Sequence, residues 1–220
     1  MRVAAKICGL STAESIDASI AGGARFVGLM FYPPSPRYVT PEQAAALAAR
    51  VPNGVTRVGV FVDVADATIE AVLSRVPLEL LQFHGKETPR RVAEVKARFR
   101  VPVMKTISVA GPGDPEAAES YLEVADWLLF DAKPPRTDSG FLPGGNGLAF
   151  DWELLKGRTW RKPWMLSGGF TAKNVAEAVA TTGTTAVDVS SGVELRPGQK
   201  DLGKIAELLA AVRALPSPGR

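Results

Sequence analysis

One unit recurs along the whole chain: a short apolar run, a polar turn, and then a segment with the spacing of an amphipathic helix. The apolar runs are nearly continuous and do not alternate with polar residues, which is typical of parallel strands covered on both faces. Eight runs follow one another: Arg2–Cys8, Phe26–Met30, Thr56–Val62, Leu80–Phe83, Val103–Ile107, Trp127–Asp131, Trp164–Ser167 and Ala186–Val189. This repeat predicts a series of parallel βα units.

The segments between the runs carry the signals of helix starts. Thr40-Pro41-Glu42-Gln43 combines a capping box with proline at the first helical position, and Ser11 is followed three residues later by Glu14. Further starts are expected at Asp66, Thr88-Pro89, Asp114-Pro115, Asp151 and Thr171, with a last helix over Leu202–Leu215.

Eight strands that alternate with eight helical segments favour an α/β fold, a closed (β/α)8 TIM barrel, because right-handed crossovers place every helix outside. A doubly wound open sheet is the competing topology. Its dinucleotide-binding form has G-x-G-x-x-G after the first strand, where this chain has Cys8-Gly9-Leu10-Ser11. We therefore expect one catalytic barrel domain over residues 1–215 and a flexible tail over 216–220, which has no means of packing.

Charge and composition exclude several classes of partner. The net charge is +3, from 26 basic and 23 acidic residues, which is too balanced for a nucleic-acid-binding face. The most basic stretch, from Lys86 to Arg100, includes acidic residues at helical spacing, so we interpret it as a solvated helix face. No apolar run approaches the roughly 18 residues that cross a bilayer, and the first residues do not resemble a signal peptide. A lone cysteine favours a reducing cytoplasm.

In a barrel of this kind the active site lies where strands end and βα loops begin. The polar, glycine-rich and reactive residues fall largely at these positions: Cys8, the loop 31–38, Asp63, His84, Asp131, Gly168-Gly169 and Ser190-Ser191-Gly192. The only long irregular segment, 132–149, has the length of a functional lid.

Two of these residues could exchange protons. Strand periodicity puts Lys6 on the same side as Cys8, where a cation would favour the thiolate; the alternative is a small buried hydrophobe. Asp131 follows an apolar run that favours the neutral acid, which suits a general acid. The alternatives for Asp131 are a helix cap or a salt bridge to Lys133.

Three more residues could contact a ligand. Asp188 lies inside a strand, where a carboxylate is costly unless it pairs with Lys6 or binds a substrate hydroxyl. Arg37 follows three nearby prolines and could hold a carboxylate through two donors, or could be a surface arginine. His84, the sole histidine, is interpreted as a pocket wall or hydrogen-bond donor. A zinc site of Cys8, His84 and Asp131 lacks ligand spacing, so we expect no metal.

Glycine-rich turns end the last two strands. Gly168 and Gly169 follow the seventh, and Ser190, Ser191 and Gly192 follow the eighth. Backbone N–H groups beside helix N-termini attract anions, and barrels often place a phosphate at these two strands. The pair of turns predicts a phosphate site.

At this point the motifs resemble one family, the phosphoribosylanthranilate isomerases. The matching segments run in order from the first strand to the eighth and cover nearly the whole chain: Lys6-Ile7-Cys8-Gly9, Phe31 with Ser35-Pro36-Arg37-Tyr38, Val58-Gly59-Val60-Phe61, Leu81-Gln82-Phe83-His84-Gly85, Phe130-Asp131-Ala132-Lys133, Gly144-Gly145 with Gly147 and Phe150-Asp151-Trp152, Leu166-Ser167-Gly168-Gly169, and Val187-Asp188-Val189-Ser190-Ser191-Gly192-Val193-Glu194. Two departures concern the lid: 134–144 is longer than expected for the family, and Asn146 stands where Thr is expected.

The resemblance implies an Amadori rearrangement of N-(5-phosphoribosyl)anthranilate in tryptophan biosynthesis. It implies Cys8 as general base, Asp131 as general acid, Arg37 at the anthranilate carboxylate and the two glycine-rich turns at the phosphate. One acid and one base suffice for this reaction, so neither metal nor nucleotide is needed and no cofactor is expected. The implied partner is a small phosphosugar, and the chain could be a monomer or a homodimer.

Two other functions are considered. An indoleglycerol phosphate synthase would share the barrel and the phosphate site, but it would be expected to need a catalytic lysine and an extra N-terminal segment, whereas this chain starts at its first strand. A barrel that binds a phospho-ligand without catalysis would have no need of Cys8 and Asp131 at two strand ends.

Overall fold

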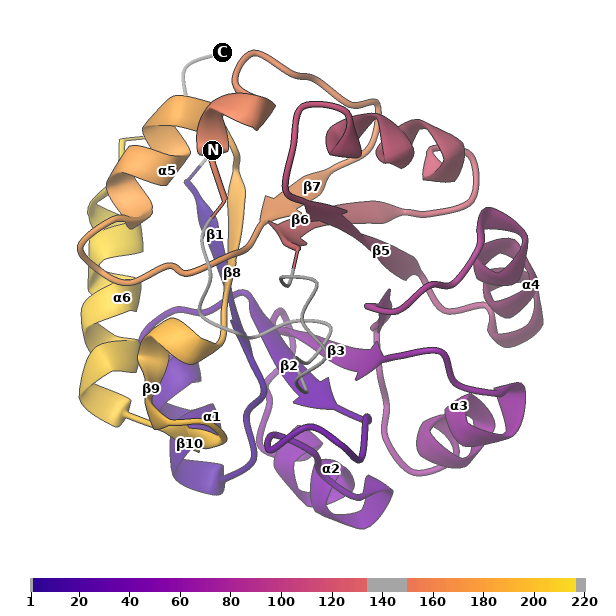
Figure 1. Ribbon diagram of the computed structural model, residues 1–220. Coiled ribbons are helices and arrows are strands. Elements are labelled where there is room, and N and C mark those ends of the chain that lie inside the picture. The colour runs from indigo at the N-terminus through magenta and orange to yellow at the C-terminus, as the bar shows by residue number, and fades with distance from the viewer. Residues whose placement is uncertain (1, 134–149, 217–220) are drawn as a thin grey trace.

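The computed structural model describes residues 2–133 and 150–216, and these form a closed barrel of eight parallel strands with helices around it (Figure 1). The strands pair in sequence order, and β1 pairs with β8 to close the barrel. Their bounds are β1 Ala4–Cys8, β2 Phe26–Met30, β3 Thr56–Phe61, β4 Leu80–Phe83, β5 Val103–Val109, β6 Trp127–Ala132, β7 Trp164–Leu166 and β8 Ala186–Val189. The predicted TIM barrel is confirmed, and each strand overlaps the apolar run that predicted it.

The helices lie in the connections between these strands. The α-helices are α1 Ala13–Ala21, α2 Pro41–Ala48, α3 Asp66–Leu73, α4 Pro89–Phe99, α5 Val175–Thr182 and α6 Leu202–Ala214. Three 3₁₀ helices are η1 Asp114–Tyr121, η2 Trp152–Leu155 and η3 Ser191–Val193. In the described part of the chain, no helix is both long and apolar enough to cross a membrane.

The helix starts predicted at Thr40, Asp66 and Thr88 are confirmed, and those at Asp114 and Asp151 begin 3₁₀ helices. The starts predicted at Ser11 and Thr171 are corrected, since the caps are Thr12 for α1 and Asn174 for α5. The Thr40 hydroxyl accepts from the Gln43 N–H, and the Gln43 side chain accepts from the Thr40 N–H, as the capping box requires. At α1 the box is made by Thr12 and Ser15, one residue later than the predicted pair of Ser11 and Glu14. Here Ser15 Oγ accepts from the Thr12 N–H, a role that Glu or Gln takes in the usual capping box.

One connection holds a hairpin that the sequence did not indicate. Between β8 and α6 the chain forms η3 and then two short antiparallel strands, β9 Glu194–Arg196 and β10 Gln199–Lys200. Gly198, with φ +83°, lies at the turn, and a side chain on it would collide with the Pro36 carbonyl. The hairpin therefore packs closely on the loop that follows β2.

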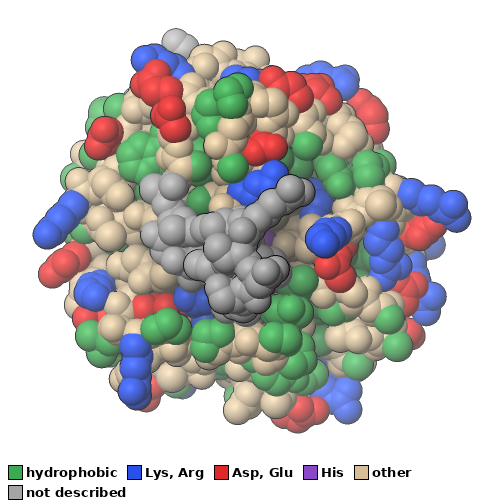
Figure 2. Space-filling view, viewed as in Figure 1, with side chains coloured by type: hydrophobic (Ala, Val, Ile, Leu, Met, Phe, Trp, Pro, Cys, Tyr) green, Lys and Arg blue, Asp and Glu red, His purple; other side chains and the backbone are tan. Residues whose placement is uncertain are grey.

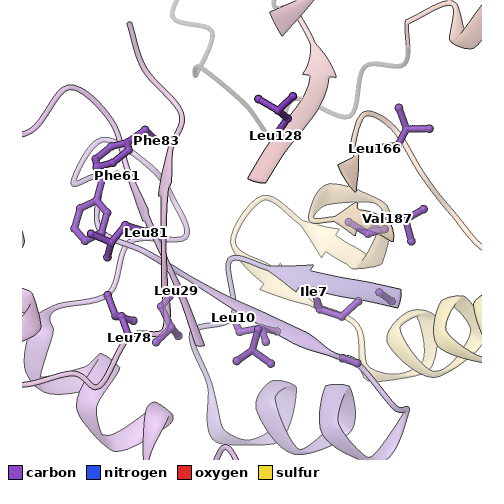
Figure 3. Packing of buried hydrophobic residues seen from close by; sticks show 14 of the residues in the cluster. Ile7, Leu10, Leu29, Phe61, Leu78, Leu81, Phe83, Leu128, Leu166 and Val187 are labelled. Carbon is purple, nitrogen blue, oxygen red and sulfur yellow. The ribbon is translucent and has the colours of Figure 1, made fainter. Parts of the chain in front are cut away.

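The apolar core has two layers, one inside the barrel and one between the barrel and its helices. The inner layer contains Val58, Leu80, Met104, Leu129, Met165 and Ala186, contributed by six strands. The outer layer takes the alternate residues of the same strands, such as Leu81, Phe83, Leu128, Leu166 and Val187, together with helix residues (Figure 3). Because successive side chains of a strand point to opposite faces, this division shows which residues line the interior.

A buried ion pair joins the first strand to the last. Lys6 and Asp188 are register partners of β1 and β8, and Lys6 Nζ donates to Asp188 Oδ1 at 3.0 Å. The Lys6 side chain is 0% exposed and that of Asp188 is 5% exposed. Burial opposes the charge of Lys6, but Asp188 and Cys8 outweigh it and raise the pKa of Lys6. The predicted ion pair between Asp188 and Lys6 is thus confirmed.

Some predictions fall outside the described residues. These are the lid departures at 134–144 and Asn146, most of the segment 132–149, and residues 217–220 of the tail. The basic stretch is described, and it forms the solvated face of α4, where Arg90 pairs with Glu94 at 2.8 Å on the surface.

Removing Asp188 should destabilise the barrel, because Lys6 would be left as a buried charge without its partner. We expect Asp188→Ala to lower the free energy of unfolding by about 3–5 kcal/mol in urea titration. The double variant Lys6→Met/Asp188→Leu should recover most of this loss, since it removes both charges. Glu123→Ala, which breaks the exposed pair with Arg161, is the matched control and should leave stability unchanged. An Asp188→Ala protein as stable as this control would contradict the prediction.

Candidate active site

The carboxyl half of the barrel interior is polar, in contrast to the apolar amino half. Counting by alternation from the inner core residues places the following side chains inside: Lys6 and Cys8 of β1, Gln82 and His84 at β4, Thr106 of β5, Asp131 of β6 and Asp188 of β8. Figure 2 shows a histidine and several Lys and Arg side chains near the centre of the face viewed in Figure 1. Five strands therefore deliver polar groups to one end of the barrel.

Cys8 is a buried free thiol beside a glycine. It pairs in register with Gly28 of β2, and a side chain on Gly28 would come within 2.9 Å of Cys8 Sγ. Gly28 thus leaves the space that the thiol occupies. Burial is the largest effect and raises the pKa of Cys8; Lys6 and Lys200 lower it, while Asp188 raises it further. Lys6 therefore acts on the thiol in the expected direction, towards the thiolate, but burial and Asp188 outweigh the two cations.

Asp131 lies against His84 and not against Lys133. His84 Nε2 is 3.2 Å from Asp131 Oδ2, which is within ion-pair distance although the angle is not that of a hydrogen bond. Asp131 Oδ1 accepts from the Ala132 N–H at 2.9 Å. Lys133 instead contacts Asp114, at 3.6 Å, so the alternative salt bridge to Asp131 is wrong. Asp131 is the last residue of β6 that faces the barrel interior, it is 6% exposed, and it lies next to the only histidine of the sequence.

The orientation of His84 depends on two neighbours, Gln82 of β4 and Thr106 of β5, to which no separate role was expected from the sequence. Gln82 Nε2 is 3.0 Å from His84 Nδ1, and Thr106 Oγ1 is 3.4 Å from the same nitrogen. With the Gln82 amide as donor, Nδ1 accepts, so the neutral tautomer carries its proton on Nε2, which lies beside Asp131. Gln82 could have been found by strand alternation, since it precedes His84 by two residues.

Arg37 is buried and pairs with Glu194 of the hairpin. Its Nε and Nη2 donate to the two carboxylate oxygens of Glu194, at 2.8 and 2.9 Å. Each of the two side chains is 3% exposed, so the alternative of a surface arginine is wrong. Gly9 allows this position, because a side chain there would come within 2.5 Å of Arg37 Cδ. The bidentate pair fixes the plane of the guanidinium.

Lys200 joins the same group from β10. Its Nζ donates to Glu194 Oε1 at 2.8 Å and to the Ser190 carbonyl at 2.9 Å. Burial opposes the charge of Glu194, but the bonds from Arg37 and Lys200 outweigh it and lower its pKa. The pairing of Glu194 with Arg37 and Lys200 was not predicted from the sequence. Glu194 and Lys200 both lie in a Pro-Gly segment after the eighth strand, which has no apolar periodicity to indicate a strand.

The two glycine-rich turns lie against each other. Gly168 and Gly169 have φ of +106° and +63°, a region that only glycine enters readily. A side chain on Gly192 would collide with the Phe170 carbonyl, so the turn after β8 packs on the backbone after β7. The predicted phosphate residues are thus neighbours, although η3 is too short to act as a helix N-terminus.

The described residues do not provide a ligand set for a metal. Within 2–133 and 150–216, no group of three or more His, Cys, Asp or Glu side chains could hold a metal ion.

The chain matches one family over most of its length. The model of "N-(5'phosphoribosyl)anthranilate (PRA) isomerase" matches residues 5–211. An N-(5'-phosphoribosyl)anthranilate isomerase of Rhodospirillum centenum is 57% identical over 215 residues, covering 98% of this chain and 100% of that protein. The enzyme of Paramagnetospirillum magneticum is 55% identical, covering 97% of this chain and 98% of that protein.

Solved structures of the same family share the fold. The phosphoribosyl anthranilate isomerase of Thermotoga maritima is 36% identical, with a TM-score of 0.85 that covers 97% of this chain and all of that one. Another structure is a complex with reduced 1-(o-carboxyphenylamino)-1-deoxyribulose 5-phosphate (35% identity, TM-score 0.82, 97% of this chain and 100% of that one). The barrel has a buried cysteine and a buried aspartate at its polar end, its sequence is similar to these relatives over nearly its full length, and this chain belongs to the phosphoribosylanthranilate isomerase family.

Proposed function

We propose that this chain converts N-(5'-phosphoribosyl)anthranilate to 1-(2-carboxyphenylamino)-1-deoxyribulose 5-phosphate, with Cys8 as general base and Asp131 as general acid. The isomerase activity and its place in tryptophan biosynthesis are those of the family. One observation supports these residue roles. Cys8 and Asp131 are each the last inward-facing residue of their strand, and both lie at the polar end of the barrel. The catalytic domain would span residues 1–215, in the cytoplasm.

The reaction needs one proton to arrive and another to leave. Asp131 gives its proton to the ring oxygen as the bond from that oxygen to C1 breaks, and the anthranilate nitrogen, which keeps its hydrogen, uses its lone pair to form a protonated imine with C1. Cys8 then removes the proton from C2, and the electron pair of that bond makes an enolamine. Proton return to C1 and loss of the enol proton give the ketone. Substrate and product are isomers, so no oxidant or reductant enters the balance.

The ionic groups around this pair suit an anionic substrate. We propose that Arg37, held by Glu194, binds the anthranilate carboxylate, and that the turns at Gly168-Gly169 and Ser190-Gly192 bind the phosphate through backbone N–H groups. Asp188 would hold Lys6 in place, and its carboxylate could also accept from a substrate hydroxyl. The phosphosugar is the only partner required. A Thermotoga maritima relative is described as dimeric, so a homodimer remains alongside the monomer as the proposed assembly.

The base assignment predicts a loss in Cys8→Ser. A serine hydroxyl is a much weaker acid than a thiol, so we expect kcat to fall by about 10²–10⁴, the range of a lost general base. In the native enzyme, burial raises the pKa of Cys8, so kcat/KM should keep rising with pH beyond the ordinary thiol range as the thiolate forms. Fluorescence assays of substrate loss over a pH series measure both. Near-normal kcat in Cys8→Ser would refute the base role.

The acid assignment is tested by separating kcat from KM. Asp131→Asn keeps the shape but not the transferable proton, so we expect a large fall in kcat, by about 10²–10⁴, with little change in KM. Arg37→Ala is the contrast, because a group that holds the carboxylate equally in ground and transition states should mainly raise KM. Thermal unfolding of both variants controls for the loss of the contact with Glu194. A change confined to KM in Asp131→Asn would show that the role is wrong.

The phosphate site is tested at Gly192. A methyl group there would collide with the Phe170 carbonyl and force the two turns apart. We expect Gly192→Ala to weaken inorganic phosphate, as a competitive inhibitor, at least tenfold, which is about 1.4 kcal/mol. Gly111→Ala is the matched control, because Gly111, like Gly192, does not have a positive φ, whereas nothing lies within 4 Å of a side chain added at Gly111. Equal inhibition constants in the two variants would place the phosphate elsewhere.

A further inference from the structure

Lys200 is a buried cation to which the proposed reaction assigns no role. Its side chain is 2% exposed, although it lies on a two-residue strand outside the barrel. Besides Glu194, its Nζ contacts both oxygens of Ser190: the carbonyl at 2.9 Å and the hydroxyl at 3.3 Å. Burying an ammonium group is costly, and the chain satisfies this one with three oxygen atoms. A hairpin of two short strands does not by itself require a buried lysine, so the contacts of Lys200 indicate a further role.

One line of contacts leads from Lys200 to Cys8. The Ser190 hydroxyl, which Lys200 contacts, donates to the Cys8 carbonyl at 3.2 Å. Three charged groups act on the thiol: Lys6 on β1, Asp188 on β8 and Lys200 on β10. Lys6 and Asp188 form an ion pair and act in opposite directions, so Lys200 is the additional cation that favours the thiolate. The influence is mutual, because Cys8 raises the pKa of Lys200, which burial lowers.

A second line leads from Lys200 to Arg37. Glu194 Oε1 accepts from both Lys200 Nζ and Arg37 Nε, each at 2.8 Å. The same hairpin packs on the Arg37 loop through Gly198 and Pro36. Lys200 therefore fixes the carboxylate that orients the guanidinium. One side chain connects the Ser190 turn, the base and the arginine, which are brought together from β8, β1 and the loop after β2.

We propose that Lys200 is a positioning residue of the isomerisation, which holds Glu194 against Arg37 and places a positive charge near Cys8 that stabilises its thiolate. This inference rests on the proposed role of Cys8 as the base. The charge acts at the step where the thiol gives up its proton, and it offsets part of the cost of forming an anion in a buried position. Lys200 does not touch the reacting atoms in this account.

The test is the titration of Cys8 in the ligand-free protein. Because the chain has one cysteine, labelling with ¹³C-cysteine gives a single Cβ resonance that follows thiol ionisation. We expect Lys200→Met to move the midpoint to higher pH and to cut the thiolate fraction on the acid side about tenfold. Lys200→Gln keeps a hydrogen-bond donor without charge and should behave in the same way, and it serves if the methionine variant fails to fold. Lys200→Arg keeps the charge and should restore most of the thiolate.

The matched control is a second buried lysine. Lys105 is 3% exposed and pairs with Glu87 at 2.8 Å, on β5 across the barrel from β1. Lys105→Met should lower stability and leave the Cys8 midpoint unchanged. If the Lys200 variants titrate like the native protein, or if Lys105→Met moves the midpoint as far, the proposal is overturned and Lys200 is only structural.

Kinetics separate this proposal from that of the base. Lys200→Met should lower kcat/KM about tenfold on the acid limb of the pH profile, with recovery at high pH where the thiolate forms again. Its KM should also rise, since Arg37 is less well held. A moved thiol midpoint with an active Cys8→Ser would refute the base and keep the electrostatic effect. An inactive Cys8→Ser with an unmoved midpoint would refute the role of Lys200 alone.

Discussion

The ion pair between Lys6 and Asp188 joins the ends of the barrel sheet and supports the polar site above it. It lies at the level where the interior changes from apolar side chains to polar ones, in register between β1 and β8. Charges at this depth are tolerated only as partners, so each fixes the position of the other. Cys8 is two residues beyond Lys6 and Ser190 two beyond Asp188. The pair therefore aligns the two strand ends from which the thiol and one of the glycine-rich turns extend.

The same burial sets the electrostatic problem that the site has to solve. A thiol enclosed beside Gly28 resists ionisation, and Asp188, the ion-pair partner of Lys6, opposes the effect of that lysine on the pKa of Cys8. The chain supplies its further cation from outside the barrel, through the hairpin β9–β10. A base of high pKa is strong but scarce in its active form, so the surrounding charges decide how much of it is available. Burial and cations thus act against each other on one atom.

Much of this arrangement could be predicted from local sequence signals. Continuous apolar runs separated by helix-start signals predicted the eight strands and the barrel. The barrel then predicted that Cys8, His84 and Asp131 lie at the carboxyl ends of their strands. The missed parts depend on contacts between distant segments. Nothing near Glu194 indicates that Arg37 lies opposite, 157 residues away, and a Pro-Gly segment reads as a loop whether or not it forms a hairpin. Lys6 favours the thiolate as expected, but the burial and the Asp188 charge that outweigh it are properties of the fold and not of the local sequence.

The division of labour follows from where rigidity is available. In the proposed mechanism, proton transfer needs two groups held at a fixed separation, and the proposed acid and base lie on β1 and β6, whose backbones the barrel hydrogen bonds fix. The proposed carboxylate-binding residue, Arg37, lies instead in the loop after β2. A buried carboxylate with two cations holds it in place, because the two hydrogen bonds of one bidentate pair fix the guanidinium plane and Lys200 holds one of the accepting oxygens. The hairpin thus fixes the position of Arg37 in its loop, as strand pairing fixes the positions of the proposed acid and base.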